Sequence, residues 1–328
     1  MNPGNRRAVL TALFANMVVA VGKLGVFSIT GSASMLAESV HSVADSANHG
    51  LLLVGGWSAQ RAPSAEHPFG YGRERYFWAF IVALVIFSLG GLFAVYQGVH
   101  KFMEPQAVES PWLAIGLLLF AAVFEGFALR TALVEARKER GNATWFEFIR
   151  RTKNPELPVI LLEDLAALLG LMLALIGISL AMITGEPRYD ALGSVAIGFL
   201  LGVVAILLAI EMRSLLIGEA AAPKQREAIV RAIEGTEHVV RLIHMRTQHL
   251  GPDELLVGAK VEFVPELSVA QLAAAIHDVE QRIRDIAPIC RVIYLEPDLY
   301  RPSEDSAGSP PTKSSARPSS PSGIGTPS

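Results

Sequence analysis

Residues 32–49 read SASMLAESVHSVADSANH and carry five strongly polar side chains among small and apolar ones. These are Glu38, His41, Asp45, Asn48 and His49. On an α-helix their spacings of three, four, three and one confine them to an arc of about 100°, so they form one polar stripe. An unpaired carboxylate in hydrocarbon is costly, so such a stripe in a membrane helix must face a partner, a metal ion or a water-filled cavity. The structural alternative is hydrogen bonding between helices that only orients a bundle.

The composition of the whole chain indicates a membrane protein. Of its 328 residues, 51% are hydrophobic and 18% are charged, and the mean hydropathy of +0.40 is too high for a soluble protein of this length. The formal net charge of −3, without a dense basic face, argues against nucleic acid as a partner. Cys290 is the single cysteine, so any bound metal needs oxygen and nitrogen ligands.

Six apolar segments are each long enough to cross a membrane, which takes about 20 residues of helix. They run approximately over Ala8–Ile29, Ala33–Gln60, Tyr76–Val99, Trp112–Val134, Leu157–Ile183 and Ala191–Ile217. Basic residues gather before the first segment and in alternate loops, at Arg6, Arg7, Arg61, Arg73, Arg75, Arg137, Lys138, Arg140, Arg150, Arg151 and Lys153, whereas the opposite loops hold Lys101 and Arg188. This asymmetry predicts that both termini are cytoplasmic. Without a transit-type leader, we expect a multi-pass protein in the lipid of a bacterial plasma membrane.

A small cytoplasmic unit is predicted after the sixth segment. Helical periodicity at residues 224–234 and 269–286 and strand patterns at 239–247, 255–263 and 291–295 indicate a compact α+β domain. A stretch rich in Ser, Pro, Gly and Thr follows, and this composition predicts disorder. We therefore expect a six-helix transmembrane domain at residues 1–218, the cytoplasmic domain at 219–299 and a disordered tail at 300–328. A short interfacial helix is expected near residues 145–149.

Two adjacent acids, Glu163 and Asp164, interrupt the fifth apolar segment, where no basic residue could neutralise them. Such a pair needs an external cation or protons. His41 and Asp45 stand one helical turn apart. With Asp164 from a facing helix they could bind one Zn²⁺, Mn²⁺, Fe²⁺ or Co²⁺ ion.

Other charged residues in the apolar segments have structural explanations. Lys23 and Glu125 could pair with each other or reach toward the interface. Asp190, at the start of the sixth segment, is expected to cap a helix N-terminus. Gly198 and Gly202 have the small-xxx-small spacing of closely packed helices.

The polar stripe, the loop HPFGYG at residues 67–72 and the segment YDALGS at residues 189–194 resemble motifs of the cation diffusion facilitator family. The resemblance covers roughly Leu10 to Pro297. It implies an α-helical membrane protein with six transmembrane helices, followed by a small cytoplasmic α+β domain of ferredoxin-like or metallochaperone-like type. It also implies homodimerisation through that domain.

The same resemblance implies a transport site made of an HxxxD pair in the second helix and a second pair in the fifth. His41 and Asp45 match the first pair, and Asp164 matches the end of the second. Ile160 stands where the second histidine would be. A branch of the family with Glu-Asp in the fifth helix shares the wording LLEDLAALLG at residues 161–170, so Glu163 is expected to supply the missing ligand.

Accessory sites are implied less completely. His67 matches one ligand of a loop site, but Tyr71 replaces a second histidine. In the cytoplasmic domain, Lys260 and Tyr294 occupy places where ligands would be expected near His244 and Glu296, so we predict no binuclear site there. Glu38, Asn48 and His49 remain candidate accessory groups of the transport site.

These features predict an efflux transporter for divalent metal cations, zinc first among them, with no cofactor besides the transported ion. Because His41 and the acids must lose protons to bind metal, metal and protons compete, which is sufficient for proton-coupled antiport by alternating access. No GxxxxGK[ST] loop is present. Two alternatives remain open: a membrane metal sensor without net transport, and an intramembrane zinc hydrolase, although HExxH is absent.

Overall fold

A computed structural model describes residues 3–141 and 143–301 of the chain. It divides into two compact units. The first contains the residues up to Ala222 together with Gln248–Leu256, and the second contains Pro223–Thr247 and the residues from Val257 onward. The tail expected from residue 300 lies, from Pro302 onward, outside the described residues.

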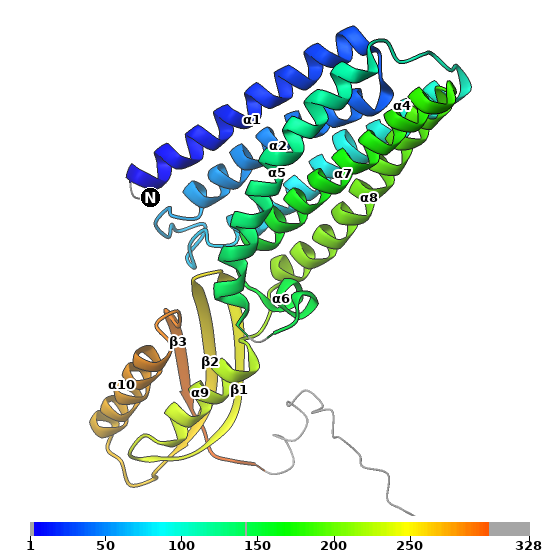
Figure 1. Cartoon of the computed structure of the whole chain (residues 1–328). Helices are drawn as coiled ribbons and strands as arrows, with labels where there is room; N and C mark the ends of the chain where they lie inside the picture. The colour runs from blue at the N-terminus through cyan, green and yellow to red at the C-terminus, as the bar shows by residue number, and fades with distance from the viewer. Residues whose placement is uncertain (1–2, 142, 302–328) are drawn as a thin grey trace, which may run out of the picture. The chain divides into compact units, whose positions relative to one another are not determined.

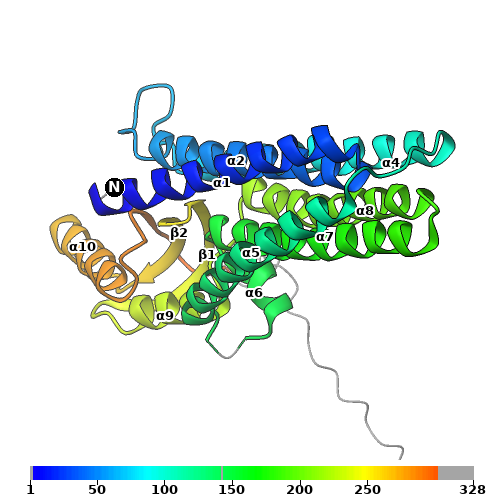
Figure 2. The same cartoon turned by 45° about the horizontal axis from the view of Figure 1, so that its top comes forward.

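Long helices run alongside one another in the first unit (Figures 1 and 2). They are α1 (Pro3–Thr30), α2 (Ala33–Ser58), α3 (Glu74–Val85), which continues through the π-helical turn η1 (Ile86–Leu92) into α4 (Phe93–Met103), α5 (Pro111–Arg140), α7 (Glu156–Thr184) and α8 (Arg188–Ile217). The short helix α6 (Trp145–Arg151) lies between α5 and α7, where an interfacial helix was expected. Each predicted apolar segment is thus helical. Helix α2 ends at Ser58, two residues before the predicted end, and the other segments extend beyond their predicted boundaries by up to several residues.

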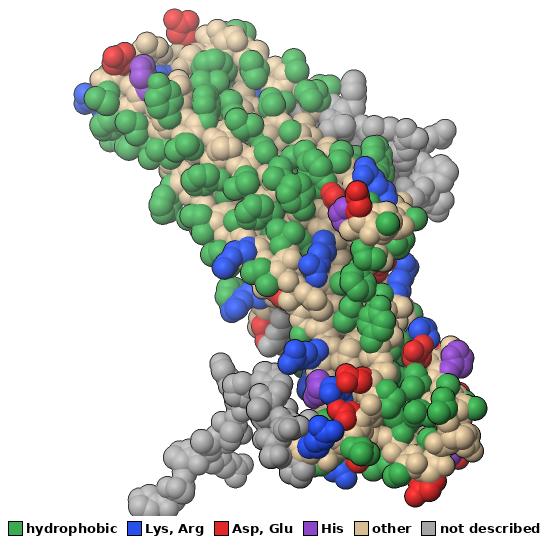
Figure 3. Space-filling view, turned by 180° about the vertical axis from the view of Figure 1, so that it is seen from behind, with side chains coloured by type: hydrophobic (Ala, Val, Ile, Leu, Met, Phe, Trp, Pro, Cys, Tyr) green, Lys and Arg blue, Asp and Glu red, His purple; other side chains and the backbone are tan. Residues whose placement is uncertain are grey.

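Four helices of the described chain are long and apolar enough to cross a membrane: Glu74–Met103, Pro111–Arg140, Glu156–Thr184 and Arg188–Ile217. The part of α1 whose side chains are described, Met17–Thr30, is also an apolar helix. Helix α2 falls below it because the polar stripe lowers its hydropathy. Large apolar side chains on the outside of the bundle, such as Phe120, Phe127 and Phe199, are exposed, and Figure 3 shows hydrophobic side chains over much of this surface. Lipid is the solvent that such a surface fits.

Local sequence signals explain where several helices begin and end. The Ser32 hydroxyl accepts a hydrogen bond from the backbone N–H of Met35 and caps α2. Thr144 and Glu147 form a capping box that starts α6. Gly185 ends α7 with a φ of +70°, a left-handed conformation that glycine adopts without steric cost.

Small residues allow α8 to approach η1 and α4 closely. A Cβ atom added to Gly198 would lie 2.6 Å from the backbone oxygen of Gly91. One added to Gly98 would lie 2.8 Å from the backbone oxygen of Ala191. Side chains longer than hydrogen are therefore excluded at these contacts, in line with the close packing expected of Gly198.

The α+β elements are α9 (Pro223–Glu234), β1 (Val239–Gly251), β2 (Glu254–Phe263), α10 (Val269–Ile286) and β3 (Val292–Pro297). The three strands form a sheet in the order β1-β2-β3. Alternate residues of β2, from Leu255 to Phe263, are buried, as expected for a strand with one face toward a core. Ala275, Val279 and Ile283 form the buried face of α10 at four-residue spacing. The predicted fold class, a helical membrane bundle followed by a small α+β domain, is confirmed.

Candidate metal site

His41 and Asp45 lie one turn apart on α2 and face each other. His41 Nδ1 is 3.4 Å from Asp45 Oδ1, and both residues are buried. Neither ring nitrogen of His41 has a hydrogen-bond partner among the described residues. A buried imidazole without partners is costly, so this ring is held in a place where an additional ligand would be stabilising.

Glu163 and Asp164 lie on α7, and Glu163 points toward α2. Asn48 Nδ2 donates a hydrogen bond of 3.1 Å to Glu163 Oε1, and the side chains of Glu163 and Asp45 border a common cavity. Glu163, the first of the two adjacent acids, therefore contacts α2 directly.

A cavity connects these acids with neighbouring helices. It is lined by Val19, Ser42, Asp45, His49, Glu125, Glu163, Asp164 and Ala167. The cavity has a volume of about 20 Å³, which is room for one water molecule or ion. Four carboxyl groups and one imidazole thus border the same small space, whereas His41 is outside this lining.

Several buried polar atoms near the cavity lack hydrogen-bond partners in the described part of the chain. Besides the two nitrogens of His41, they are Glu38 Oε1, Asp45 Oδ1, Asn48 Oδ1 and Glu163 Oε2. At the same time, no group of three or more His, Cys, Asp or Glu side chains within residues 3–141 and 143–301 is placed to hold one metal ion. The donors therefore stand near one another without converging on a single point, and binding an ion requires them to move together.

Glu38, an accessory candidate from the stripe, is neutralised by a basic residue of α1. Lys23 Nζ lies 3.1 Å from Glu38 Oε2 and donates a hydrogen bond of 2.7 Å to Ser42 Oγ. The hypothesis that Lys23 pairs with Glu125 is wrong: its ion pair is with Glu38. Sequence spacing alone could not show which acid of two different helices lies nearest to Lys23.

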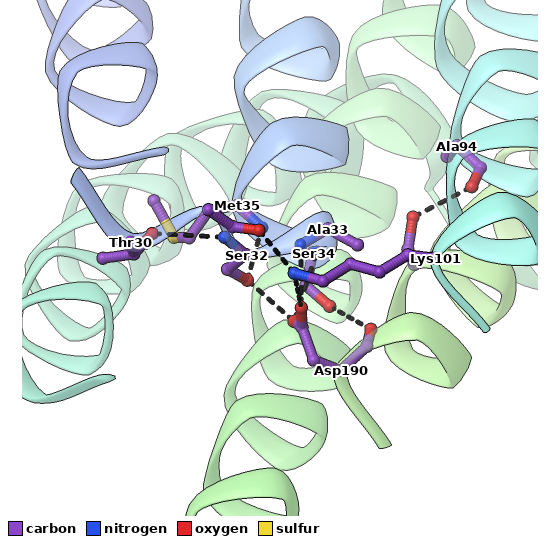
Figure 4. Close-up of polar contacts among 10 residues, drawn as sticks. Thr30, Ser32, Ala33, Ser34, Met35, Ala94, Lys101 and Asp190 are labelled. Carbon is purple, nitrogen blue, oxygen red and sulfur yellow. Dashed lines mark hydrogen bonds and ion pairs between the residues drawn. The ribbon is translucent and has the colours of Figure 1, made fainter. Parts of the chain in front are cut away.

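Asp190 caps a helix, but the helix is α2 and not its own (Figure 4). Its carboxylate accepts hydrogen bonds from Ser32 Oγ at 2.7 Å, from the backbone N–H of Ala33 at 2.7 Å and from that of Ser34 at 3.2 Å. Lys101 Nζ lies 3.4 Å from the same carboxylate and also donates to the backbone oxygen of Gly31. Lys101, assigned to a loop from the sequence, is thus a buried residue in the last turn of α4.

The remaining accessory candidates lie away from the cavity. His67 is exposed, and its ring packs against that of Tyr71 with 4.6 Å between the centroids. In the α+β domain, Lys260 Nζ lies 3.2 Å from Glu296 Oε1 and 2.7 Å from Asp298 Oδ2. Lys260 therefore puts a positive charge beside acids that could otherwise attract a metal ion.

Comparisons with known proteins show which family this chain resembles. Residues 9–217 match the cation efflux transmembrane domain, and residues 221–298 match the cytoplasmic domain of cation efflux proteins. The mouse proton-coupled zinc antiporter SLC30A9 is 32% identical over 92% of this chain and 53% of its own length. Metal tolerance protein C4 of Arabidopsis thaliana is 34% identical over 81% of this chain and 58% of its own length.

A bacterial relative matches over most of both proteins. The manganese efflux system protein MneP of Bacillus subtilis is 23% identical over 86% of this chain and 90% of its own. By contrast, the chain spans about half the length of the SLC30A9 proteins that it matches. Members of this family are transporters rather than enzymes. Taken with the helical bundle and the α+β domain, these matches show that the chain belongs to the cation efflux, or cation diffusion facilitator, family.

Proposed function

We propose that the protein exports divalent transition-metal cations, zinc first among them, in exchange for protons. The observation that carries the proposal is the set of buried nitrogen and oxygen atoms of His41, Asp45 and Glu163 that lack partners inside a helical bundle. Membership of the cation efflux family supports the view that these donor atoms bind a transported ion. The transported ion is the substrate, and no other cofactor is needed.

The proposed ligands are His41 and Asp45 from α2 and Glu163 and Asp164 from α7. These carboxylates and this imidazole bind a metal ion only after losing their protons, so metal and protons exclude each other. Asp45, Glu163 and Asp164 border one small cavity, so the groups that would hold protons there are the ones that a metal ion needs, which supports this competition. If α2 and α7 open alternately to the two sides of the membrane, an inward proton gradient drives metal outward.

The donor set bears on the choice of metal. One imidazole with three carboxylates is harder than a site with two imidazoles, so Mn²⁺ or Fe²⁺ compete better here than in a two-histidine site. The relatives include a protein named as a zinc antiporter and one named as a manganese efflux protein. We place zinc first because the more similar of these two relatives is the zinc antiporter.

We further propose a homodimer in a bacterial plasma membrane, with both termini in the cytoplasm. The match of residues 221–298 to the cytoplasmic domain of cation efflux proteins supports the assembly, and the distribution of basic residues supports the orientation. Domains at residues 1–218 and 219–299 fit these two roles. A metal sensor without net transport is the competing function, and only a flux measurement separates the two.

The test is metal uptake by inside-out proteoliposomes under an imposed proton gradient, with Zn²⁺, Mn²⁺, Fe²⁺ and Co²⁺ compared. Wild type, Asp45→Asn and Asp164→Asn are measured beside Ser46→Ala, a control that removes a hydroxyl bonded to the backbone of Ser42 on the same helix. Saturable, gradient-dependent uptake in wild type and the control, lost in both acid variants, is expected. Binding without uptake in wild type would favour the sensor, and normal uptake by either acid variant would refute the proposed ligands.

A further inference from the structure

The imidazole that faces the cavity is that of His49. His49 lines it together with Asp45, Glu163 and Asp164, whereas His41 does not. Two of the lining carboxyl groups also carry a buried oxygen without a hydrogen-bond partner in the described structure, Asp45 Oδ1 and Glu163 Oε2. An open space bordered by unpartnered oxygens and one imidazole has the chemistry of a site for a divalent cation.

The hydrogen bond of His49 fixes which of its nitrogens can bind metal. His49 Nδ1 lies 2.8 Å from the backbone oxygen of Asp45. Because a carbonyl oxygen only accepts, Nδ1 must carry the hydrogen, and in the neutral ring Nε2 keeps its lone pair. Metal-binding histidines commonly donate their other ring N–H to a carbonyl in this way, which holds the ring in orientation. His41 has no such bond.

His49 also stands where helix α7 lacks a histidine. It follows Asp45 by one turn on α2, and Ile160 precedes Asp164 by one turn on the antiparallel helix α7. Ile160 packs against an apolar cluster that includes Ala136, Phe148 and Leu161 and is not part of the cavity lining. The imidazole at this level of the bundle therefore comes from α2.

Glu125 on α5 completes the lining from another helix. It makes no hydrogen bond or ion pair within the described residues, and Lys23 is held by Glu38 and Ser42. A partly buried carboxylate that faces a cavity with three other acids increases the attraction for a cation there.

We propose that His49 Nε2 and the carboxylate of Glu125 are ligands of the transported ion, at a second binding position next to the His41–Asp45 pair that shares Asp45 and Asp164 with it. During transport, the ion occupies this second position either before or after the position at His41, as the bundle closes to one side of the membrane and opens to the other. The inference rests on the proposed function. It adds an imidazole from α2 and a carboxylate from α5 to the ligands that α7 supplies.

The experiment measures Zn²⁺ and Mn²⁺ binding to the purified full chain in detergent by equilibrium dialysis. His49→Ala and Glu125→Gln are compared with wild type and with Ser46→Ala. We expect each of the two variants to raise the Kd for Zn²⁺ at least tenfold, and His49→Ala to weaken Zn²⁺ more than Mn²⁺, because manganese prefers oxygen ligands. Ser46→Ala should bind as wild type. If His49→Ala does not fold, as judged by gel filtration, His49→Gln takes its place with the same expectation, since it keeps a polar side chain of similar length without the imidazole.

Flux in proteoliposomes separates this inference from the proposed function. Wild type that binds zinc through His49 but moves none of it supports the second position and refutes transport. Transport with an unchanged Kd and KM in His49→Ala and Glu125→Gln overturns the second position and leaves the proposed function standing. Absence of metal binding to wild type overturns both.

Discussion

Lys23 of α1 and Glu38 of α2 form an ion pair of 3.1 Å in the interior of the helical bundle, where neither side chain is exposed to solvent. Removing one member of such a pair leaves an uncompensated buried charge, whereas removing both does not. The pair also explains how a carboxylate of the polar stripe is tolerated without a metal ion.

Loss of Lys23 alone should therefore be more damaging than loss of both partners. Lys23→Met is expected to reduce the free energy of unfolding by about 3–5 kcal/mol, and the double variant Lys23→Met/Glu38→Gln to recover most of that loss. Thermal or denaturant unfolding of the purified chain in detergent measures both effects. Equal destabilisation by the single and double variants would show that the ion pair is not the cause.

Asp190 should hold the start of α2 in place. In Asp190→Ala the backbone N–H groups of Ala33 and Ser34 lose their acceptor and Lys101 loses its counter-ion. Local opening then becomes easier, so hydrogen exchange at residues 33–35 should accelerate by about tenfold or more, the factor that corresponds to losing about 1.4 kcal/mol of local stability. Mass spectrometry of peptides from α2 measures this, with exchange in α10 as the internal reference. Unchanged exchange at residues 33–35 would contradict the capping role.

Cys290 should be a slow nucleophile in the folded protein. Its side chain is buried, and burial raises the pKa of the thiol to about 11. At pH 8 the reactive thiolate is then about one part in a thousand of the thiol, against roughly a quarter for an exposed cysteine. Maleimide labelling at pH 8 should be slow in the native chain and rapid after unfolding. Rapid labelling of the native chain would show that the α+β domain opens at this position.

His249 should make stability depend on pH. Burial lowers the pKa of its imidazole below the usual value, with the hydrogen bond to the backbone of Gly251 opposing the shift. Since the unfolded chain binds the proton more readily, the contribution of His249 to stability is complete above about pH 6.5 and is lost as the pH falls from there toward the lower folded pKa. Unfolding midpoints between pH 8 and 5 should decline less steeply in His249→Gln than in wild type. Parallel profiles would assign the decline to other groups.

The sequence predicts those features that depend on one segment at a time. The stripe from Glu38 to His49, the helix Val269–Ile286 and the alternation of β2 follow from periodicity, and the structure has them within a few residues of the predicted ends. The adjacency of His41 and Asp45 follows from a four-residue spacing on one helix.

Features that depend on the rotation of one helix against another were not predictable. The partner of Lys23 is Glu38 and not Glu125, and Asp190 caps a helix that begins 157 residues earlier in the chain, at Ala33. Periodicity gives the polar face of each helix but not the angle at which that face meets its neighbours. For the same reason the sequence alone did not show that Glu163 faces Asn48 or that Glu125 borders the cavity.

The contact between Gly198 of α8 and Gly91 of η1 leaves no side chain between two backbones. Sliding one helix along the other by about one turn would bring Val195 or Val95, which lie on the same faces, toward a place where only a hydrogen atom fits. Helix α8 and the segment from η1 to α4 are thus interlocked at this contact and resist sliding along each other. A change of opening that slides α8 along this segment would therefore have to separate the two helices first.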